Sequence, residues 1–349
     1  MISQPDWHKV KERMLGYWER EEMDRCCVSM RIPLPGYVGM GGHHYYDTKT
    51  ASERARAGFE HLACVGEAFP CLFPYFGTAG VAEYTGCRAT RTPETTWFDP
   101  WMEDEPDASR IGYTHPEPFE KQKQAIRELI RLSKGDYPVS VSDNCGMLDA
   151  LAAIRGSENL MMDMLSEPEF VEEAVRRLVD IYKQTQEELF SLTYENNEGA
   201  VQSWMQLWAP KRMAQMQCDL SVMISPDMFN RYAMPELEEL SAFLDYPVYH
   251  LDGQEQIRHL DALLSIKKLR AIQWTHVAGQ PKPSMFIPVL KKIQQAGKNL
   301  ILIPTADEVP MLLDNLSSRG LHLLIADVTT VEEAQDLMAL IKKRSVVRD

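Results

Sequence analysis

Two side chains near residue 250 have the types and spacing that proton transfer or metal binding requires. His250 and Asp252 lie two residues apart in a short apolar run, so in a strand they point to the same side of the pleat. An imidazole and a carboxylate on one face can form a proton-transfer pair or bind a divalent cation. The alternative is a hydrogen-bonded core histidine beside a solvated aspartate. We favour the functional interpretation because both residues lie where the strand gives way to a loop.

A second candidate is the segment 201–208, in which two kinds of side chain alternate. One set is Gln202, Trp204, Gln206 and Trp208, and the other is Val201, Ser203, Met205 and Leu207. We predict a single strand whose apolar side packs on helices and whose Gln/Trp side lines a pocket. Tryptophan and glutamine together offer ring stacking and hydrogen bonds to a ring-shaped or sugar-like ligand. The alternative is a core face with hydrated amides.

Carboxylates at the ends of other predicted strands complete the catalytic candidates. Asp143 and Asn144 follow the run 138–142, where capping of the next helix is the alternative role. Asp219 follows Cys218 in a similar position. The other candidates lie near strand ends or in aromatic loops: Arg31, Trp97, Gln273, Trp274 and His276 for substrate contact, and Cys218 and Asp327 for metal binding. Each has a plain structural alternative, such as an exposed arginine or a small buried thiol.

The elements that must position these residues alternate along the chain. Apolar runs at 27–32, 138–142, 201–208, 218–224, 248–252, 269–275, 300–304 and 321–326 are predicted strands, and amphipathic segments lie between most of them. This βαβα order predicts a parallel sheet covered by helices. No GxGxxG or P-loop motif follows a strand, so neither NAD nor ATP is expected. We therefore predict one α/β domain over residues 1–349, a (β/α)₈ barrel of the TIM type with its site at the carboxyl ends of the strands.

Three further features accompany the predicted barrel. An amphipathic N-terminal helix is expected over 6–22, and another helix over 51–66. The aromatic segments 33–46 and 70–110 are read as inserted loops, the first as a candidate lid or binding loop. Ser166 and Glu169 have the spacing of a helix capping box.

Composition narrows the function classes. The formal net charge of −14 disfavours nucleic acid and anionic membranes as partners. Seven cysteines at irregular spacing, without a CxxC pair, favour a reducing compartment over a disulfide framework. We see no leader sequence and no run of 18 apolar residues, so a cytoplasmic protein is expected. The sequence leaves a homo-oligomer open.

The chain resembles the uroporphyrinogen decarboxylase superfamily, which includes zinc-dependent, corrinoid-linked methyltransferases. The resemblance spans most of the chain and rests on an ordered series of short segments: 143–146 (DNCG), 154–156 (IRG), 166–169 (SEPE), 224–226 (ISP) with Pro235, and 250–253 (HLDG). It implies a (β/α)₈ barrel, in agreement with the alternation of elements. It also implies an active site that uses His250.

Two departures from the family pattern bear on function. The decarboxylases carry an Arg-Gln-Ala-Gly-Arg-Tyr stretch that grips substrate carboxylates, whereas residues 29–33 here read SMRIP and keep one arginine, Arg31. The methyltransferases bind zinc through His-x-Cys and a later Cys. Here His250 is followed by Asp252, and the last strand offers Asp327. Such a harder donor set would suit zinc with a water, another divalent ion, or no metal.

Three hypotheses follow. The first is a methyltransferase-like enzyme that acts on a small methylated compound, with a divalent metal at His250 and Asp252 and a corrinoid carried by a partner protein. The second is a decarboxylase or lyase without metal, in which Asp143 or Asp219 stabilises a developing cation and Arg31 holds a carboxylate. The third is a non-catalytic binder of a small polar or sugar-like ligand.

Overall fold

A mainly parallel sheet forms the centre of the molecule. The computed structural model describes residues 6–39, 41–144, 146–276 and 279–348. Within them, seven strands form one sheet in the order β2–β1–β11–β10–β9–β8–β7, and only the β1–β2 pair is antiparallel. The strands are β1 (Cys27–Pro33), β2 (Leu62–Gly66), β7 (Met213–Met216), β8 (Tyr246–Asp252), β9 (Ala271–Thr275), β10 (Asn299–Leu302) and β11 (Leu321–Leu324).

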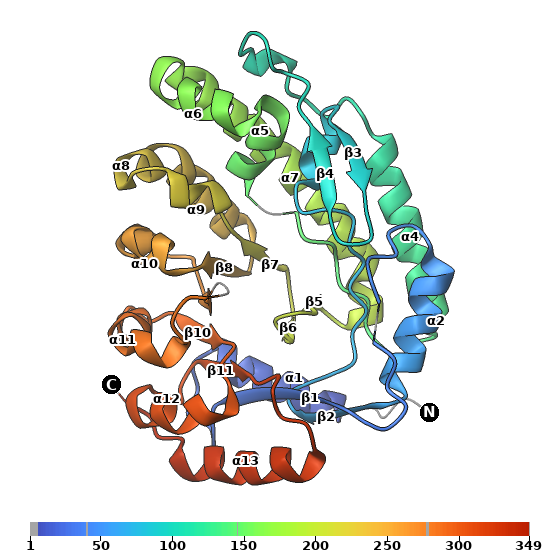
Figure 1. The fold of residues 1–349 in the computed structure, drawn as a ribbon, viewed down its shortest axis with the longest axis vertical. Helices are drawn as coiled ribbons and strands as arrows, with labels where there is room; N and C mark the ends of the chain where they lie inside the picture. The colour runs from blue at the N-terminus through green and yellow to red at the C-terminus, as the bar shows by residue number, and fades with distance from the viewer. Residues whose placement is uncertain (1–5, 40, 145, 277–278, 349) are drawn as a thin grey trace.

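Helices lie outside the strands and surround them (Figure 1). The α-helices are α1 (Trp7–Trp18), α2 (Thr48–Phe59), α3 (Gly80–Tyr84), α4 (Glu117–Ser133), α5 (Met147–Arg155), α6 (Ser157–Ser166), α7 (Pro168–Asn197), α8 (Pro226–Met228), α9 (Met234–Phe243), α10 (Leu260–Ser265), α11 (Ile287–Gln295), α12 (Val309–Asn315) and α13 (Val331–Arg344). Shorter turns of helix are η1 (Ala108–Arg110), η2 (Asp219–Met223), η3 (Phe229–Ala233), η4 (Gln254–His259), η5 (Pro283–Phe286) and η6 (Ala306–Glu308).

The apolar strands are buried on both faces. Every residue of β10 and β11 is buried, and Leu300 pairs with Leu321 in parallel register. A parallel strand needs apolar side chains on both faces because helices cover one side and packed side chains fill the other. The mixed α/β class predicted from the alternation of elements is therefore confirmed.

Several predicted elements differ from the structure. The run 138–142 makes one bridge, Val139 with Leu72. The Asn197 side chain takes the other backbone hydrogen bonds of Val139: Oδ1 accepts from Val139 N at 3.1 Å, and Nδ2 donates to Val139 O at 2.8 Å. The predicted helix 51–66 ends at Phe59, and its apolar end is β2. The predicted strand 218–224 is the 3-10 turn η2.

The prediction of a single strand over 201–208 is wrong. The segment folds back as a hairpin of β5 (Ala200–Gln202) and β6 (Leu207–Ala209), with a turn over 203–206. Gln206 has a φ of 49°, a left-handed conformation that a regular strand does not contain. The four alternating polar residues therefore do not share one face.

The aromatic segment 70–110 contains elements that the sequence did not predict. Besides α3 and η1, it holds a two-stranded hairpin of β3 (Arg88–Arg91) and β4 (Thr96–Asp99).

The starts of α13 and α7 differ in their caps. Thr330 and Glu333 form a reciprocal capping box at α13, whereas Ser166 belongs to the last turn of α6 and α7 begins with no side-chain cap at Glu167.

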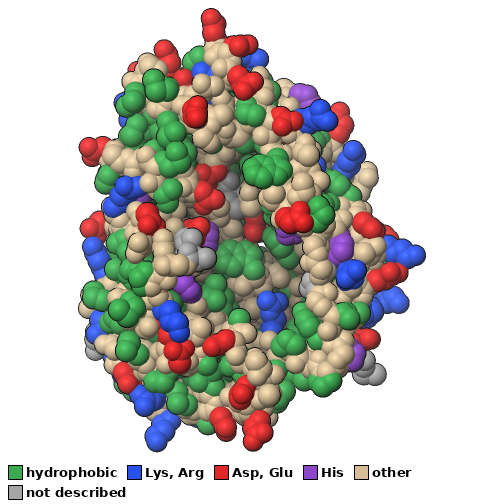
Figure 2. Space-filling model, in the orientation of Figure 1, with side chains coloured by type: hydrophobic (Ala, Val, Ile, Leu, Met, Phe, Trp, Pro, Cys, Tyr) green, Lys and Arg blue, Asp and Glu red, His purple; other side chains and the backbone are tan. Residues whose placement is uncertain are grey.

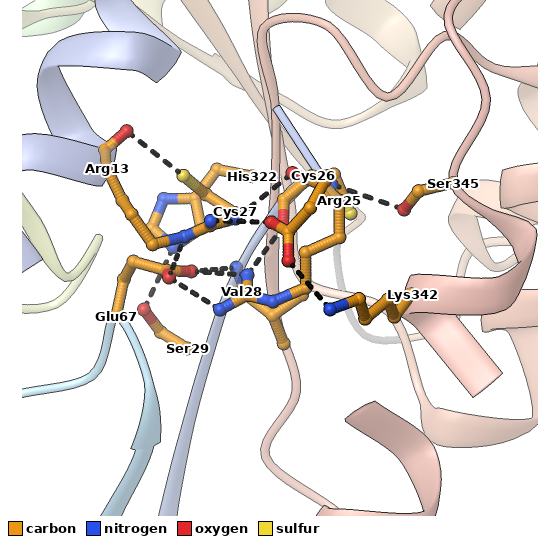
Figure 3. A network of polar contacts seen from close by, with 11 residues as sticks. Arg13, Arg25, Cys26, Cys27, Val28, Ser29, Glu67, His322, Lys342 and Ser345 are labelled. Atoms are coloured by element: carbon orange, nitrogen blue, oxygen red, sulfur yellow. Dashed lines mark hydrogen bonds and ion pairs between the residues drawn. The ribbon is translucent and has the colours of Figure 1, made fainter. Parts of the chain in front are cut away.

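A buried carboxylate joins β1, β2 and α1 near the start of β1. Glu67 is 1% exposed and accepts hydrogen bonds from Val28 N at 2.7 Å, from Arg25 at 2.7 and 2.9 Å, and from Arg13 Nε at 2.6 Å (Figure 3). These cations hold the pKa of Glu67 below its ordinary value against the opposing effect of burial. This network fixes the strand that carries Arg31.

Across the described residues, helices that combine the length and apolarity needed to cross a bilayer are absent.

Candidate functional site

A cavity of about 490 Å³ opens among loops that follow the central strands. Figure 2 shows the hollow in this face of the molecule, with acidic, basic and histidine side chains around it. On β1, alternate residues Ser29, Arg31 and Pro33 line the cavity, while Met30 and Ile32 face the core. Its size lies within the range of small-molecule sites, about 300–1,000 Å³.

Arg31 brings a positive charge into this cavity. Its side chain is exposed, and it forms no hydrogen bond or ion pair with any residue that the structure describes. A guanidinium without a carboxylate partner, placed in a concave site, can pair with an anionic group of a ligand.

Aromatic side chains form much of the cavity wall. Tyr37, His43, Tyr45, Tyr75 and Trp204 all line it. The rings of His43 and Tyr75 stack with centroids 3.9 Å apart, and the Tyr45 hydroxyl donates at 2.6 Å to a backbone carbonyl of the β3–β4 turn. The loop 33–46, predicted as a lid or binding loop, therefore supplies part of the wall.

Asp143 is not among the cavity-lining residues but contacts Trp204, which is. Its Oδ1 accepts from Gln202 Nε2 at 2.8 Å, and its Oδ2 accepts from the Trp204 indole at 3.2 Å. The side chain is enclosed by protein but keeps partial exposure. Burial raises the pKa of Asp143 to about 6, although both hydrogen bonds and His250 favour the charged form. Asp143 can therefore hold a proton at near-neutral pH and release it locally.

A row of glutamine amides connects Asp143 with Asp219. Gln202 Nε2 also donates to Gln215 Oε1 at 2.9 Å, Gln215 Nε2 donates to Gln217 Oε1 at 3.1 Å, and Gln217 Nε2 donates to Asp219 Oδ2 at 3.0 Å. The three amides are buried, whereas Asp219 is exposed. The row fixes two acids at different depths of one site.

His250 lies beside these acids. It contributes a favourable charge to both Asp143 and Asp219, and its ring meets Trp204 edge-on with centroids 5.3 Å apart. Gln273 Nε2 donates to Thr275 Oγ1 at 2.6 Å, so Gln273 Oε1 faces His250 and accepts from Nδ1–H. This pairing leaves Nε2 as the ring nitrogen for a ligand.

Asp252 lies on the same side of β8 as His250, as the spacing predicted. Both residues keep partial exposure, while Leu251 between them and Tyr249 before them are buried. The Asp252 charge, together with burial, raises the pKa of Asp219. His250, Asp252 and Asp219 therefore lie close enough to influence one another, whereas the sequence had predicted only that His250 and Asp252 share a side.

Two further acids accept hydrogen bonds from the backbone near Asp219 and at the start of α5. Asp149 accepts from Asp219 N and Leu220 N, both at 2.9 Å, and burial with the Asp219 charge raises its pKa. Glu236 accepts from Met147 N at 2.6 Å, and burial raises its pKa to about 8. These acids cap the starts of η2 and α5, and so position the segment that carries Asp219.

The predicted metal donors are engaged separately. Both oxygens of Asp327 accept from Ala306 N, at 3.0 and 3.1 Å. Cys218 is buried, and burial raises the pKa of its thiol far above the ordinary value. Outside the few residues left undescribed, His, Cys, Asp and Glu side chains do not gather in a group of three suited to a cation. The donor set His250, Asp252, Asp327 and Cys218 therefore does not fit a resident metal ion.

Several predicted substrate contacts lie elsewhere. Trp208 is buried on β6 and donates to Asn197 O at 3.1 Å. Gln273 and Trp274 on β9 are both fully buried, Trp274 against Phe286, and neither lines the cavity. Trp97 is 65% exposed on β4 and is not among the cavity-lining residues.

The remaining predicted contacts fall into two groups. Gln206 lines the cavity and holds its turn by accepting from Phe69 N at 2.9 Å. Asn144 is buried and packs against Gly80. His276 follows β9 with partial exposure, and its contact with a ligand stays a prediction.

Sequence reasoning missed Gln215 and Gln217. Their signal was present, because Gln215, Gln217 and Asp219 repeat at every second residue, which places them on one side of an extended segment. His43 and Tyr75 were missed for a different reason, since they come from separate irregular loops that only the fold brings together.

Comparison with known proteins adds one finding. No protein-family model and no curated protein matches the chain. Among solved structures, the chain is similar to a methyltransferase from Methanosarcina mazei, with a TM-score of 0.59 over 96% of this chain and 98% of that chain. The likeness is one of fold. At 13% sequence identity, the two chains share an architecture over nearly their whole lengths.

Proposed function

We propose that this protein is a methyltransferase-type enzyme. It takes a small methylated compound into the cavity and passes the methyl group to an acceptor, a corrinoid carried by a partner protein. The observation that carries the proposal is Asp143, an enclosed acid with a pKa raised to about 6 that lies beside Trp204 and His250. The fold shared with a methyltransferase supports the general class.

The chemical step needs a proton donor at the leaving group. The bond between the methyl carbon and a substrate oxygen or nitrogen breaks, and its electron pair stays on that heteroatom. The Asp143 carboxylic acid gives its proton to the heteroatom, while the methyl group bonds to the acceptor. A reduced corrinoid would supply a strongly nucleophilic centre for the methyl group. Because an alkoxide or amide anion is a poor leaving group, general acid catalysis at Asp143 is worth about 10²–10⁴ in rate.

The other residues of the site bind and orient. Trp204 forms a wall next to Asp143, His250 Nε2 points a hydrogen-bonding group at the ligand, and Arg31 pairs with an anionic substituent. Because Asp327 is bonded to Ala306 N and the Cys218 thiol is buried with a raised pKa, the proposal assigns protonation to Asp143 and routes no step through a metal ion.

The proposal also includes a closed barrel fold and membership of the family that the sequence resembles. Between β2 and β7, three further segments follow in order: residues 69–72, residues 138–142 and β5. Leu72 bridges Val139, Asn197 joins Val139 to the end of α7, and Gln202 of β5 bonds Gln215 of β7. These links support a closed (β/α)₈ barrel and a divergent member of the uroporphyrinogen decarboxylase superfamily.

Methyl transfer to free corrinoid tests the function. The purified protein is incubated with methyl ethers, methylamines and methyl thioethers in the presence of cob(I)alamin, and methylcobalamin formation is followed by absorbance. We expect turnover of at least one compound, and a loss of about 100-fold or more in Asp143→Asn. Asp107→Asn, a change at the exposed cap of η1, which has no cavity-lining residue, should retain activity.

Two results would count against the proposal. Inertness of the folded protein towards every methyl donor would remove the reaction, and full activity of Asp143→Asn would remove the acid from it. Elemental analysis of the same preparation tests the metal, since a stoichiometric cation at His250 would contradict the assignment of protonation to Asp143 alone.

A further inference from the structure

The cavity has an apolar end that the proposed chemistry does not use. Five side chains line this end, which we call the apolar lobe: Ala51, Phe59, Leu62, Leu72 and Leu129. They come from α2, β2, the segment 69–72 and α4, which are distant in sequence. Four of them belong to a small hydrophobic cluster of their own, and Ala51 packs against it. The lobe is therefore a boundary between that cluster and the cavity.

Arg31 lies on the strand that borders the lobe. In the antiparallel pair of β1 and β2, Arg31 is opposite Cys64 and Pro33 is opposite Leu62. Arg31 and Pro33 face the cavity, and Leu62 belongs to the lobe. This cavity therefore contains a guanidinium that pairs with none of the described residues, beside apolar side chains. Trp204, which donates to Asp143 outside the cavity lining, also lines it.

Empty apolar space beside an unpaired charge is costly in the free protein. Apolar walls gain free energy when a ligand displaces water from them, and a guanidinium gains most from a planar, bidentate anion. A small polar substrate would leave the space beside these largely buried apolar side chains unfilled, and a neutral hydrocarbon would leave Arg31 without a partner. One ligand satisfies both features only when it carries an anionic group and an apolar group together.

We infer that the substrate is an amphipathic monoanion, namely a carboxylate attached to a ring or short hydrocarbon group. The carboxylate pairs with Arg31, the apolar group fills the lobe, and the methylated heteroatom lies towards Asp143 and Trp204. This inference rests on the proposed function for the place of the methyl group. The binding preference itself does not depend on methyl transfer.

Binding of unmethylated probes tests the inference separately from the reaction. Benzoate carries both groups, acetate carries the anion alone, and benzyl alcohol carries the ring alone. Dissociation constants are measured by isothermal titration calorimetry without any methyl acceptor. We expect benzoate to bind at least about tenfold more tightly than either of the other probes.

Two variants of one helix locate the apolar group. Ala51→Leu adds a side chain into the lobe and should weaken benzoate by about tenfold while leaving acetate unchanged. Ala57→Leu makes the same change on α2 at a half-buried position that does not line the cavity, and it should leave both constants unchanged. Leu129→Phe, which fills the lobe from α4, repeats the test if Ala51→Leu does not fold.

The outcomes separate the inference from the proposed function. Benzoate no tighter than acetate, or unaffected by both lobe-filling variants, would overturn the amphipathic substrate. Benzoate binding retained in Arg31→Gln would overturn the anion site. Tight, lobe-dependent benzoate binding together with failed methyl transfer would sustain this inference and contradict the proposed reaction.

Discussion

Replacing Asp143 by asparagine should change the pH dependence of stability in a direction set by its raised pKa. The pKa is about 6 in the folded protein, against an ordinary value of 3.8. A raised pKa means that the folded state binds the proton more tightly than the unfolded state. The wild-type protein therefore loses stability as pH rises from about 4 through 6, and Asp143→Asn does not share this loss.

The magnitude follows from the shift. A change of about two pKa units corresponds to about 3 kcal/mol between the protonated and the charged limits. Between pH 5 and pH 8, the wild type loses about 1.4 kcal/mol of this free energy. Asparagine presents an amide N–H₂ to one of the two donors, Gln202 or Trp204, which costs about 1 kcal/mol at every pH. The pH-dependent part is therefore separable from the lost hydrogen bond.

Urea denaturation at pH 5 and pH 8 measures both parts. We expect the stability of Asp143→Asn relative to the wild type to improve by about 1.4 kcal/mol from pH 5 to pH 8. Asp47→Asn is the control, because hydrogen bonds from Thr50 lower the pKa of Asp47, so Asp47 is charged in both states from pH 5 to pH 8 and the relative stability of this variant should stay the same. An Asp143→Asn difference that is the same at both pH values would refute the raised pKa.

Three further predictions concern buried groups. Glu67→Gln removes the charge that pairs with Arg25 and Arg13, and should destabilise the protein by about 3 kcal/mol at pH 7, measured by urea denaturation; a loss under 1 kcal/mol would contradict it. Gly146→Ala should cost about 2 kcal/mol or more in the same assay, because φ is 54° and a Cβ would collide with the Asp149 carboxylate; equal stability would show that the contact relaxes freely. The raised pKa of about 8 makes the wild type lose stability as pH rises from 6 to 9, and Glu236→Gln should lose less stability over that interval. Plots of melting temperature against pH that run parallel for the two proteins would contradict this prediction.

Local patterns in the sequence were enough to predict several local features of the structure. The spacing of His250 and Asp252 placed both on one side of β8, because side chains alternate along any strand. The cap at Thr330 was equally predictable, since it needs only residues three apart in sequence. The alternation of apolar runs with amphipathic segments was enough to predict a mixed α/β protein.

The same patterns failed where long-range packing decided the backbone. Residues 201–208 alternate as a strand does, yet they turn back at Ser203–Gln206, and Gln206 binds the backbone of Phe69 within that turn. The Asn197 side chain makes the backbone hydrogen bonds with Val139 that a neighbouring strand would otherwise make. A period-two pattern reports which side chains alternate, but it carries no information about these distant partners.

What the sequence determined by itself was the class of fold, most of the helices, and the face shared by His250 and Asp252. The tertiary structure alone decided that Asp143 meets Trp204 and that Arg31 shares a cavity with the apolar lobe. The physical reason is that propensity and periodicity act within a few neighbouring residues. A raised pKa or an unpaired charge in a cavity depends instead on desolvation, which is set by every segment packed around the group.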